Sequence, residues 1–240
     1  FMEPMGKRFY IGMDNSGDKV STGEFFNVPV AQELGLEFIV YHYRPEGSVE
    51  AETVKARELI RKFEERNIYF INNNEVANWS DYKTGPDGFD WVNRPEDRCH
   101  CFKYPPSVLK AYAESPAFAG IIYDELEHLI INRNLSITLK GGRKDLPQFP
   151  DATDMNLREA DEHICEYAKK LLAENIDNGA PRVMGEHVWP VLFHNFARAG
   201  LQIAYKQQKE NWSNVYAACA AGAAMQYGTE LWTYRYMESK

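Results

Sequence analysis

The chain has 240 residues, of which 44% are hydrophobic and 26% are charged, and its formal net charge is −8. This is an ordinary globular composition, and an acidic balance without a basic block argues against nucleic acid or an anionic membrane surface as a partner. No apolar run in the sequence reaches the length of a membrane span. The length suits one barrel-sized domain, and we expect residues 1–240 to form a single one.

The first half of the chain alternates between predicted strands and helices. Short apolar runs predict strands at residues 9–13, 38–41 and 68–71. A short helix is expected at residues 29–34. Ser48 is the expected cap of a longer helix, whose apolar residues from Ala56 to Phe63 recur at the spacing of one helix face.

The second half continues the alternation. In chain order it predicts a helix at 106–115, a strand at 119–123, a helix capped by Thr153 or Asp154, a strand at 182–185, a helix at 193–199, a strand at 202–205, a helix at 215–225 and a strand at 231–234. The strands are continuously apolar rather than alternating. Repeated strand–helix units of this kind indicate a parallel sheet.

Two parallel architectures compete. A doubly wound sheet usually carries a glycine-rich phosphate loop after an early strand, and the segment from Asp14 to Gly17 lacks that spacing. Polar residues instead follow nearly every strand, which favours a (β/α)8 TIM-type barrel. The patterns give seven strands, so either the barrel is truncated and its eighth strand lies beyond Lys240, or an early strand is not revealed by the pattern.

The four cysteines do not predict a metal site. Cys99 and Cys101 flank His100, but a structural zinc site needs two ligand pairs and no second pair exists in the sequence. Cys165 and Cys219 fall on apolar helix faces and are interpreted as small core residues. We therefore expect neither a metal nor another cofactor.

Functional side chains are expected at the carboxyl ends of the strands, where parallel barrels collect them. The polar and aromatic residues at those positions are Asp14, His42, Tyr43, Asn74, Glu75, Asp124, Glu125, Glu127, His128, Glu186, His187 and Trp189. The set is rich in carboxylates and aromatic rings. It contains no nucleophile elbow and no phosphate cradle.

Paired carboxylates suit the cleavage of a glycosidic bond. One carboxyl must be protonated to assist the leaving oxygen, and the other must be ionised to attack the anomeric carbon or to activate water. Asp124, Glu125 and Glu186 are the catalytic candidates. The candidates for substrate binding are Asp14, His42, Asn74, Glu75, Glu127, His128, His187, Trp189 and Trp232. The alternative interpretation of Glu186 is an ion-pair partner for Arg182 or Lys206.

The Asp124-Glu125 pair after the fourth predicted strand resembles the (β/α)8 glycoside hydrolases. In the best-known clan of that superfamily an Asn-Glu pair ends the fourth strand and supplies the acid/base, so the resemblance implies this role for Glu125. This chain has Asp in place of the Asn. The clan's nucleophile follows the seventh strand, whereas Glu230 precedes it here, and Glu186 is better placed as the second carboxylate.

Three functions remain open at this point. The first is a glycoside hydrolase that acts on a polysaccharide or oligosaccharide, and a polysaccharide substrate would favour a secreted or periplasmic protein. The second is a metal-dependent barrel hydrolase or lyase, in which His42, His128 and His187 surround a divalent ion with the acids. The third is a carbohydrate-binding barrel without catalysis. We expect the first, with a carbohydrate as partner; the sequence leaves the oligomeric state open.

Overall fold

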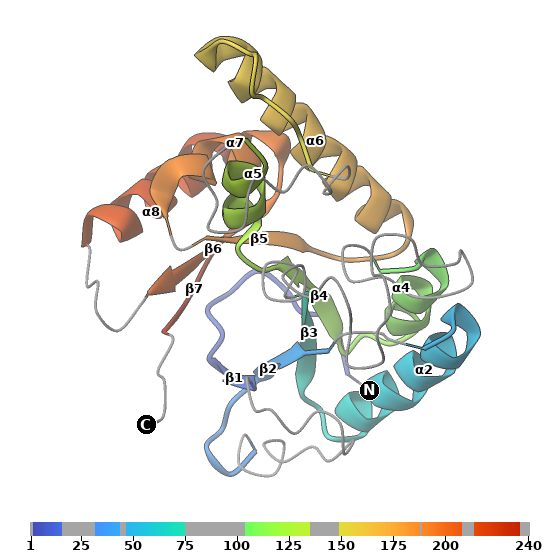
Figure 1. Ribbon diagram of the computed structural model, residues 1–240. Coiled ribbons are helices and arrows are strands. Elements are labelled where there is room, and N and C mark those ends of the chain that lie inside the picture. Colours follow the sequence, from blue (N-terminus) through green and yellow to red (C-terminus); the bar gives the residue numbers. More distant parts are fainter. Residues whose placement is uncertain are drawn as a thin grey trace, which may run out of the picture. The chain divides into compact units, whose positions relative to one another are not determined.

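The computed structural model describes residues 2–15, 32–43, 47–74, 104–134, 149–187, 189–207 and 214–235 (Figure 1). The strands found in these ranges form one seven-stranded sheet in chain order, β1 to β7. The strand pairs whose register is described are parallel. The chain divides into two compact units, and each is described by itself below.

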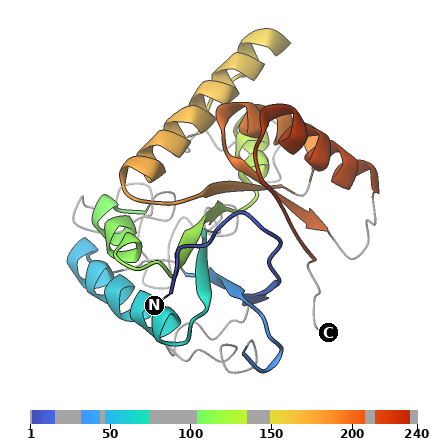
Figure 2. The same ribbon diagram turned by 180° about the vertical axis from the view of Figure 1, so that it is seen from behind.

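The first unit contains β1 to β4 and two helices. Its elements are β1 (Gly12–Asn15), β2 (Phe38–His42), α2 (Val49–Glu65), β3 (Tyr69–Asn74), α4 (Pro106–Ala113) and β4 (Phe118–Tyr123, whose last residue belongs to the second unit). Helices α2 and α4 lie side by side in both views (Figures 1 and 2). This order repeats the strand–helix alternation that the sequence predicts.

Aromatic side chains build the core of the first unit. The ring of Phe70 on β3 lies 4.9 Å from that of Phe63 on α2 and 5.1 Å from that of Tyr112 on α4. Phe63, Phe70 and Tyr112 are fully buried. Buried aromatic surface of this size dominates the free energy of packing, so these rings join both helices to the sheet.

The start of α2 confirms the predicted cap. The Ser48 hydroxyl accepts a hydrogen bond from the Ala51 amide at 3.2 Å, which satisfies one of the free amides of the first turn. Ala56, Ile60 and Phe63 form the buried face of the helix. The predicted stripe therefore faces the core.

Two strand boundaries in the first unit differ from the prediction. Strand β1 begins at Gly12 rather than at residue 9, and Phe9 is 81% exposed. The predicted apolar run is therefore exposed, rather than buried, at its first residue. Strand β3 continues to Asn74, so Asn72, Asn73 and Asn74 are buried inside the strand instead of following it.

The second unit contains the remaining elements. They are α5 (Leu126–Asn134), α6 (Leu157–Asp177, whose last residues belong to the first unit), β5 (Val183–His187), η2 (Pro190–Leu192), α7 (Phe193–Ala199), β6 (Gln202–Gln207), α8 (Asn214–Tyr227) and β7 (Leu231–Arg235). Strand β6 pairs in parallel with β5 and β7. Helices α7 and α8 pack on β6 (Figure 1).

Helix α6 starts with a different cap from the one predicted. Asn156, rather than Thr153 or Asp154, accepts hydrogen bonds from the amides of Arg158 and Glu159, each at 3.0 Å. The Glu159 carboxylate accepts from the Asn156 amide in return, which makes a capping box. Leu157 is 93% exposed, so the predicted apolar stripe begins later along the helix.

Several expectations fall on residues outside the described ranges. These residues are 29–31 of the expected short helix, Glu75, Cys99, His100 and Cys101. Residues 32–33 are helical and Leu34 lies in a turn. In the described part of the chain, no helix combines the length and apolarity that crossing a membrane requires.

Candidate active site

The turn between β4 and α5 presents two acids of the candidate site, Asp124 and Glu125. Glu125 adopts the left-handed backbone conformation, with φ at 48°, which is uncommon for a residue with a side chain. Its amide donates to the carbonyl oxygen of Glu186 at 3.1 Å, and its own carbonyl accepts from the His128 amide at 3.0 Å. These bonds fix the turn to the end of β5 and to α5. Unusual backbone held in this way is common at functional sites.

Three carboxylates and one ammonium group converge in the second unit. Asp124, Glu125 and Glu186 each offer an oxygen atom, and these atoms lie within 4.8 Å of one another. The Lys206 ammonium at the end of β6 lies 3.4, 3.1 and 3.0 Å from oxygen atoms of Asp124, Glu125 and Glu186, respectively. Asp124 and Glu186 are buried, whereas the Glu125 side chain is 14% exposed. Glu125 is therefore the carboxylate that solvent reaches.

The surroundings of Glu125 keep it ionised. Burial alone would raise its pKa, but His128 and Lys206 oppose that effect, and together they lower the pKa of Glu125 to about 2. His128 Nδ1 lies 3.0 Å from Glu125 Oε2. Positive neighbours at hydrogen-bond distance favour the charged carboxylate.

The pKa values of Asp124 and Glu186 are shifted upward, in the opposite direction to that of Glu125. Burial, together with the charge of Glu186, raises the pKa of Asp124 well above its usual value. Burial also raises the pKa of Glu186, and the charge of Lys206 limits the rise, so that its pKa is about 7. At neutral pH this cluster therefore contains a protonated carboxyl close to an ionised one, which is the division that two-carboxylate catalysis requires.

A second layer of titratable groups adjoins Glu125. Glu127 Oε2 lies 2.9 Å from His187 Nδ1, and both side chains are fully buried. Glu127 Oε1 lies 4.0 Å from Nε2 of His128. Burial lowers the pKa of His128, but Glu125 and Glu127 outweigh it and the net shift is upward. Glu127 and His187 are thus enclosed and paired with each other, and Glu127 also lies near His128.

The two described tryptophan candidates lie in different settings. The ring of Trp189 packs on that of His128, with 4.8 Å between centroids, and Trp189 is 44% exposed. It therefore offers an aromatic face beside Glu125. Trp232 is near the start of β7, where its indole donates to Glu230 at 3.2 Å. Glu230 precedes β7, as the sequence indicated, while the carboxylates gather at the ends of strands.

The first unit gathers a smaller polar group at the ends of β1 to β3. His42 Nε2 lies 2.5 Å from Asp14 Oδ1, and the Asn73 side-chain amide lies 3.4 Å from the same ring nitrogen. Asn74 ends β3 and is buried. Asn73 is a member of this group that the sequence interpretation omitted. Tyr43 donates its hydroxyl to Glu52, whose carboxylate is buried at the start of α2.

Lys206 is a member of this cluster that the sequence interpretation did not include among the candidate site residues. It follows the apolar run of the sixth predicted strand, so its position at a strand end was a usable signal. It had been considered only as a partner of Glu186. The structure brings it to all three acids at once.

The spacing of the carboxylates bears on metal binding. Three carboxylate oxygen atoms within 4.8 Å could hold a divalent cation. The Lys206 ammonium lies among them, however, and supplies positive charge at that place. The cluster thus carries a cation of its own.

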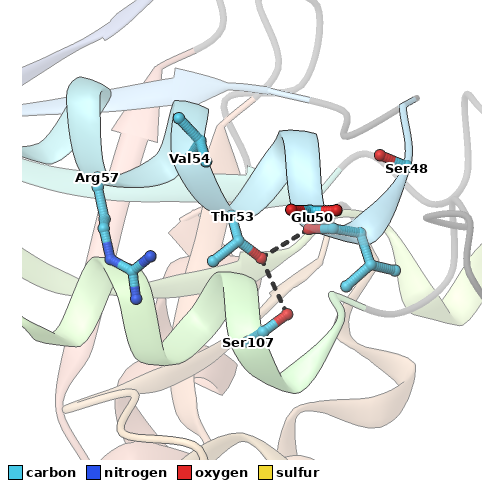
Figure 3. Close-up of a pocket in the computed structure, with 7 residues that line it drawn as sticks. Ser48, Glu50, Thr53, Val54, Arg57 and Ser107 are labelled. Carbon is cyan, nitrogen blue, oxygen red and sulfur yellow. Dashed lines mark hydrogen bonds between the residues drawn. The ribbon is translucent and has the colours of Figure 1, made fainter.

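A hollow in the first unit offers no comparable chemistry. It is lined by Ser48, Val49, Glu50, Thr53, Val54 and Arg57 of the α2 segment and by Ser107 of α4 (Figure 3). The Thr53 hydroxyl lies 3.0 Å from that of Ser107 and donates to the Val49 carbonyl oxygen at 2.6 Å. These hydroxyls bond to the helices themselves, and none of the predicted site residues lines the hollow.

The sequence matches no protein-family model and no curated protein. Solved structures do resemble it. A β-1,4-D-mannanase from Cryptopygus antarcticus aligns at 10% identity with a TM-score of 0.52, over 98% of this chain and 86% of that chain. A deoxyribose phosphate aldolase from Aeropyrum pernix aligns at 11% identity with a TM-score of 0.44, over 92% and 74%. A mandelate racemase/muconate lactonizing protein from Herpetosiphon aurantiacus aligns at 10% identity with a TM-score of 0.46, over 99% of this chain; the chain spans about half the length of that protein, 49%.

The fold is that of TIM-barrel enzymes. Parallel strands in chain order with helices between them agree with it, as does the alignment to the mannanase. At 10% identity this likeness concerns the fold alone. The reaction therefore has to be argued from the side chains.

Proposed function

We propose that the protein is a glycoside hydrolase that uses two carboxylates, with Glu125 as the ionised group and Glu186 as the proton donor. The observation that carries the proposal is the convergence of three carboxylates, since oxygen atoms of Asp124, Glu125 and Glu186 lie within 4.8 Å of one another. The directions of the pKa shifts agree with it. The pKa of Glu125 is lowered to about 2, whereas that of Glu186 is raised to about 7. Glycosidic cleavage needs one carboxyl in each state.

The proposed reaction assigns one step to each acid. Glu186 gives its proton to the glycosidic oxygen as the bond from that oxygen to the anomeric carbon breaks. The Glu125 carboxylate attacks the anomeric carbon from the other side, and water then releases the sugar from the resulting ester. The resemblance to known hydrolases gives Glu125 the acid/base role, but its low pKa favours the nucleophilic role instead.

The separation of the acids supports a retaining outcome. Their oxygen atoms lie within 4.8 Å. Retaining enzymes place the two carboxyl groups about 5–5.5 Å apart, and inverting enzymes leave roughly 6.5–9.5 Å to admit a water molecule. A limit of 4.8 Å is shorter than both ranges and nearer to that of retaining enzymes.

The accessible groups indicate how a sugar would approach. Glu125 and Trp189 are both reached by solvent, and His128 contacts the two of them. The flat face of Trp189 would stack against the C–H side of a sugar ring. The Glu125 carboxylate would then face the anomeric carbon. Glu186 is fully buried, so the proposal requires the bound sugar to displace side chains that enclose it.

A glycan panel tests the proposal. Purified protein is incubated with unactivated polysaccharides and oligosaccharides, and products are followed by mass spectrometry. We expect release of shorter glycans from at least one substrate, and loss of that release in Glu125→Gln. Glu58→Gln, which changes an exposed acid on α2, is the matched control and should retain full activity.

Two results would contradict the proposal. Full activity in Glu125→Gln would remove Glu125 from the reaction. Glycan binding without turnover by the wild-type protein would favour the non-catalytic carbohydrate-binding barrel.

A further inference from the structure

Lys206 stands out because it contacts every acid of the catalytic cluster. Its ammonium lies 3.0 to 3.4 Å from oxygen atoms of Asp124, Glu125 and Glu186, and its side chain is 12% exposed. Two of these carboxylates follow β4, and the third is on β5. A single flexible side chain is ordered here by groups from separate elements.

The register of the sheet explains the position of Lys206. Glu186 of β5 pairs with Ala204 of β6, and Lys206 stands two residues further along β6. Residues two apart in a strand share a face, so Ala204 and Lys206 lie on the face that Glu186 occupies. Ala204 is small and fully buried, which leaves Lys206 room to reach Glu186.

The charges around Lys206 do not balance if every acid is ionised. Three carboxylates and one ammonium would leave two uncompensated negative charges in a largely buried cluster, an arrangement that costs free energy. A proton on the Asp124–Glu186 pair relieves part of this cost. How tightly that proton is held depends on the positive charge beside it.

We propose that Lys206 is a positioning residue of the proposed hydrolase: its ammonium, which lies within 3.4 Å of all three acids, favours the ionised form of Glu125 and weakens the hold of Glu186 on the proton that it transfers. The inference rests on the proposed function of this cluster. The directions of the pKa shifts agree with it, since the charge of Lys206 lowers the pKa of Asp124, Glu125 and Glu186.

Other titratable groups lie near Lys206 and also affect a pH titration of the cluster. They are Asp124 and Glu125 in the turn after β4, Glu127 and His128 on α5, and Glu186 and His187 on β5. Removing Lys206 changes the positive charge without altering any of these groups. A change in titration can therefore be assigned to the ammonium.

The test compares Lys206→Met with Lys206→Arg. Carboxyl carbons are labelled, and their NMR shifts are followed against pH in the absence of substrate. In Lys206→Met the titration of Glu186 should move upward by about one pH unit or more. In Lys206→Arg, which keeps the charge, it should stay near the wild-type value. Lys110→Met on the exposed face of α4 is the matched control and should leave Glu186 unchanged.

A pH–rate profile adds a second readout. If Glu186 donates the proton, the alkaline decline of kcat/KM in Lys206→Met should move upward together with the NMR titration. A merely structural role would lower stability or kcat without moving that limb. The inference would be overturned if, in Lys206→Met, neither the alkaline decline of kcat/KM nor the titration of Glu186 moved.

A folding measurement covers the case in which Lys206→Met is unstable at neutral pH. Raising the pKa of Glu186 in the folded state makes that state bind more protons than the unfolded chain, so stability should fall more steeply with rising pH than in the wild type. Denaturation at pH 5 and pH 8 measures this slope, and equal slopes would contradict the role of Lys206.

The two proposals can fail separately. A shifted Glu186 titration in a protein that hydrolyses no glycan would refute the proposed function and leave the charge-setting role of Lys206. Hydrolysis that depends on Glu125, with no response of Glu186 to Lys206→Met, would refute only the role of Lys206.

Discussion

The strand ends of the two units carry polar groups of different kinds. Among the described residues, those of the first unit hold Asp14, which pairs with His42, and the amides of Asn73 and Asn74. Those of the second unit hold three acids and an ammonium, and their pKa values are displaced in opposite directions. Proton transfer needs such displaced acids, whereas amides can only exchange hydrogen bonds. For this reason we place the proposed reaction in the second unit.

The largest expected effect on hydrolysis comes from replacing Glu186, the proposed proton donor of the second unit. Glu186→Gln keeps the size of the side chain but cannot donate a proton as a carboxylic acid does, so kcat should fall by about 10²- to 10⁴-fold. The measurement is steady-state hydrolysis of a glycan found in the panel. Thermal unfolding of the same variant serves as the folding control. Activity within about twofold of the wild type would exclude Glu186 as the donor.

The pH dependence of kcat/KM tests the pKa values that distinguish the acids of the second unit. Glu186 must be protonated, and its pKa is about 7, so kcat/KM should fall about tenfold per pH unit above that value. Glu125 must be ionised, and its pKa of about 2 keeps it so throughout the mildly acidic range. We expect a profile that is level below neutrality and declines above it. A profile that rises from pH 6 to pH 9 would be incompatible with these assignments.

A smaller effect is expected at the aromatic face beside Glu125. Trp189→Ala removes an exposed indole, and a stacked aromatic contact is worth about 1 kcal/mol, so KM should rise about fivefold with little change in kcat. Phe9→Ala, which removes an exposed aromatic ring outside the candidate site, is the matched control. An equal response of the two variants would mean that Trp189 has no special part in sugar binding.

The smallest effect concerns metal. Because Lys206 supplies positive charge among the three acids, dialysis against a chelator should change hydrolysis by less than about twofold. The assay is repeated after addition of Mg²⁺, Mn²⁺ or Zn²⁺. Loss of activity in chelator with recovery on metal addition would favour the metal-dependent alternative over the proposed mechanism.

Local patterns predicted much of the fold. The Ser48 cap, the buried face of α2 and the strand before Asp124 all follow from neighbouring residues, and the structure confirms them. The predicted start of β1 was wrong because an apolar residue such as Phe9 can be exposed to solvent, and the sequence alone does not show which residues are exposed. The cap of α6 was misplaced because Thr153, Asp154 and Asn156 are all suitable cap residues close together.

The candidate site was predictable only in its parts. Asp124, Glu125 and Glu186 were found because they end apolar strands. The convergence on Lys206 brings in Asp124 and Glu125 from 82 and 81 positions away, and it depends on the register of β5 and β6. The pairing of Glu127 with His187 spans 60 positions. Contacts of that range follow from the folded sheet and leave no local pattern.

The central claim is that two neighbouring acids of the second unit lose their protons at widely different pH, so that Glu125 is ionised over a pH range in which Glu186 still holds a proton. Carboxyl NMR of the wild-type protein, titrated from pH 4 to pH 9 without substrate, tests it most directly. The account predicts that Glu125 stays ionised over the whole range and that Glu186 titrates near pH 7. Titration of both carboxyls together near the value of a free glutamate would contradict it.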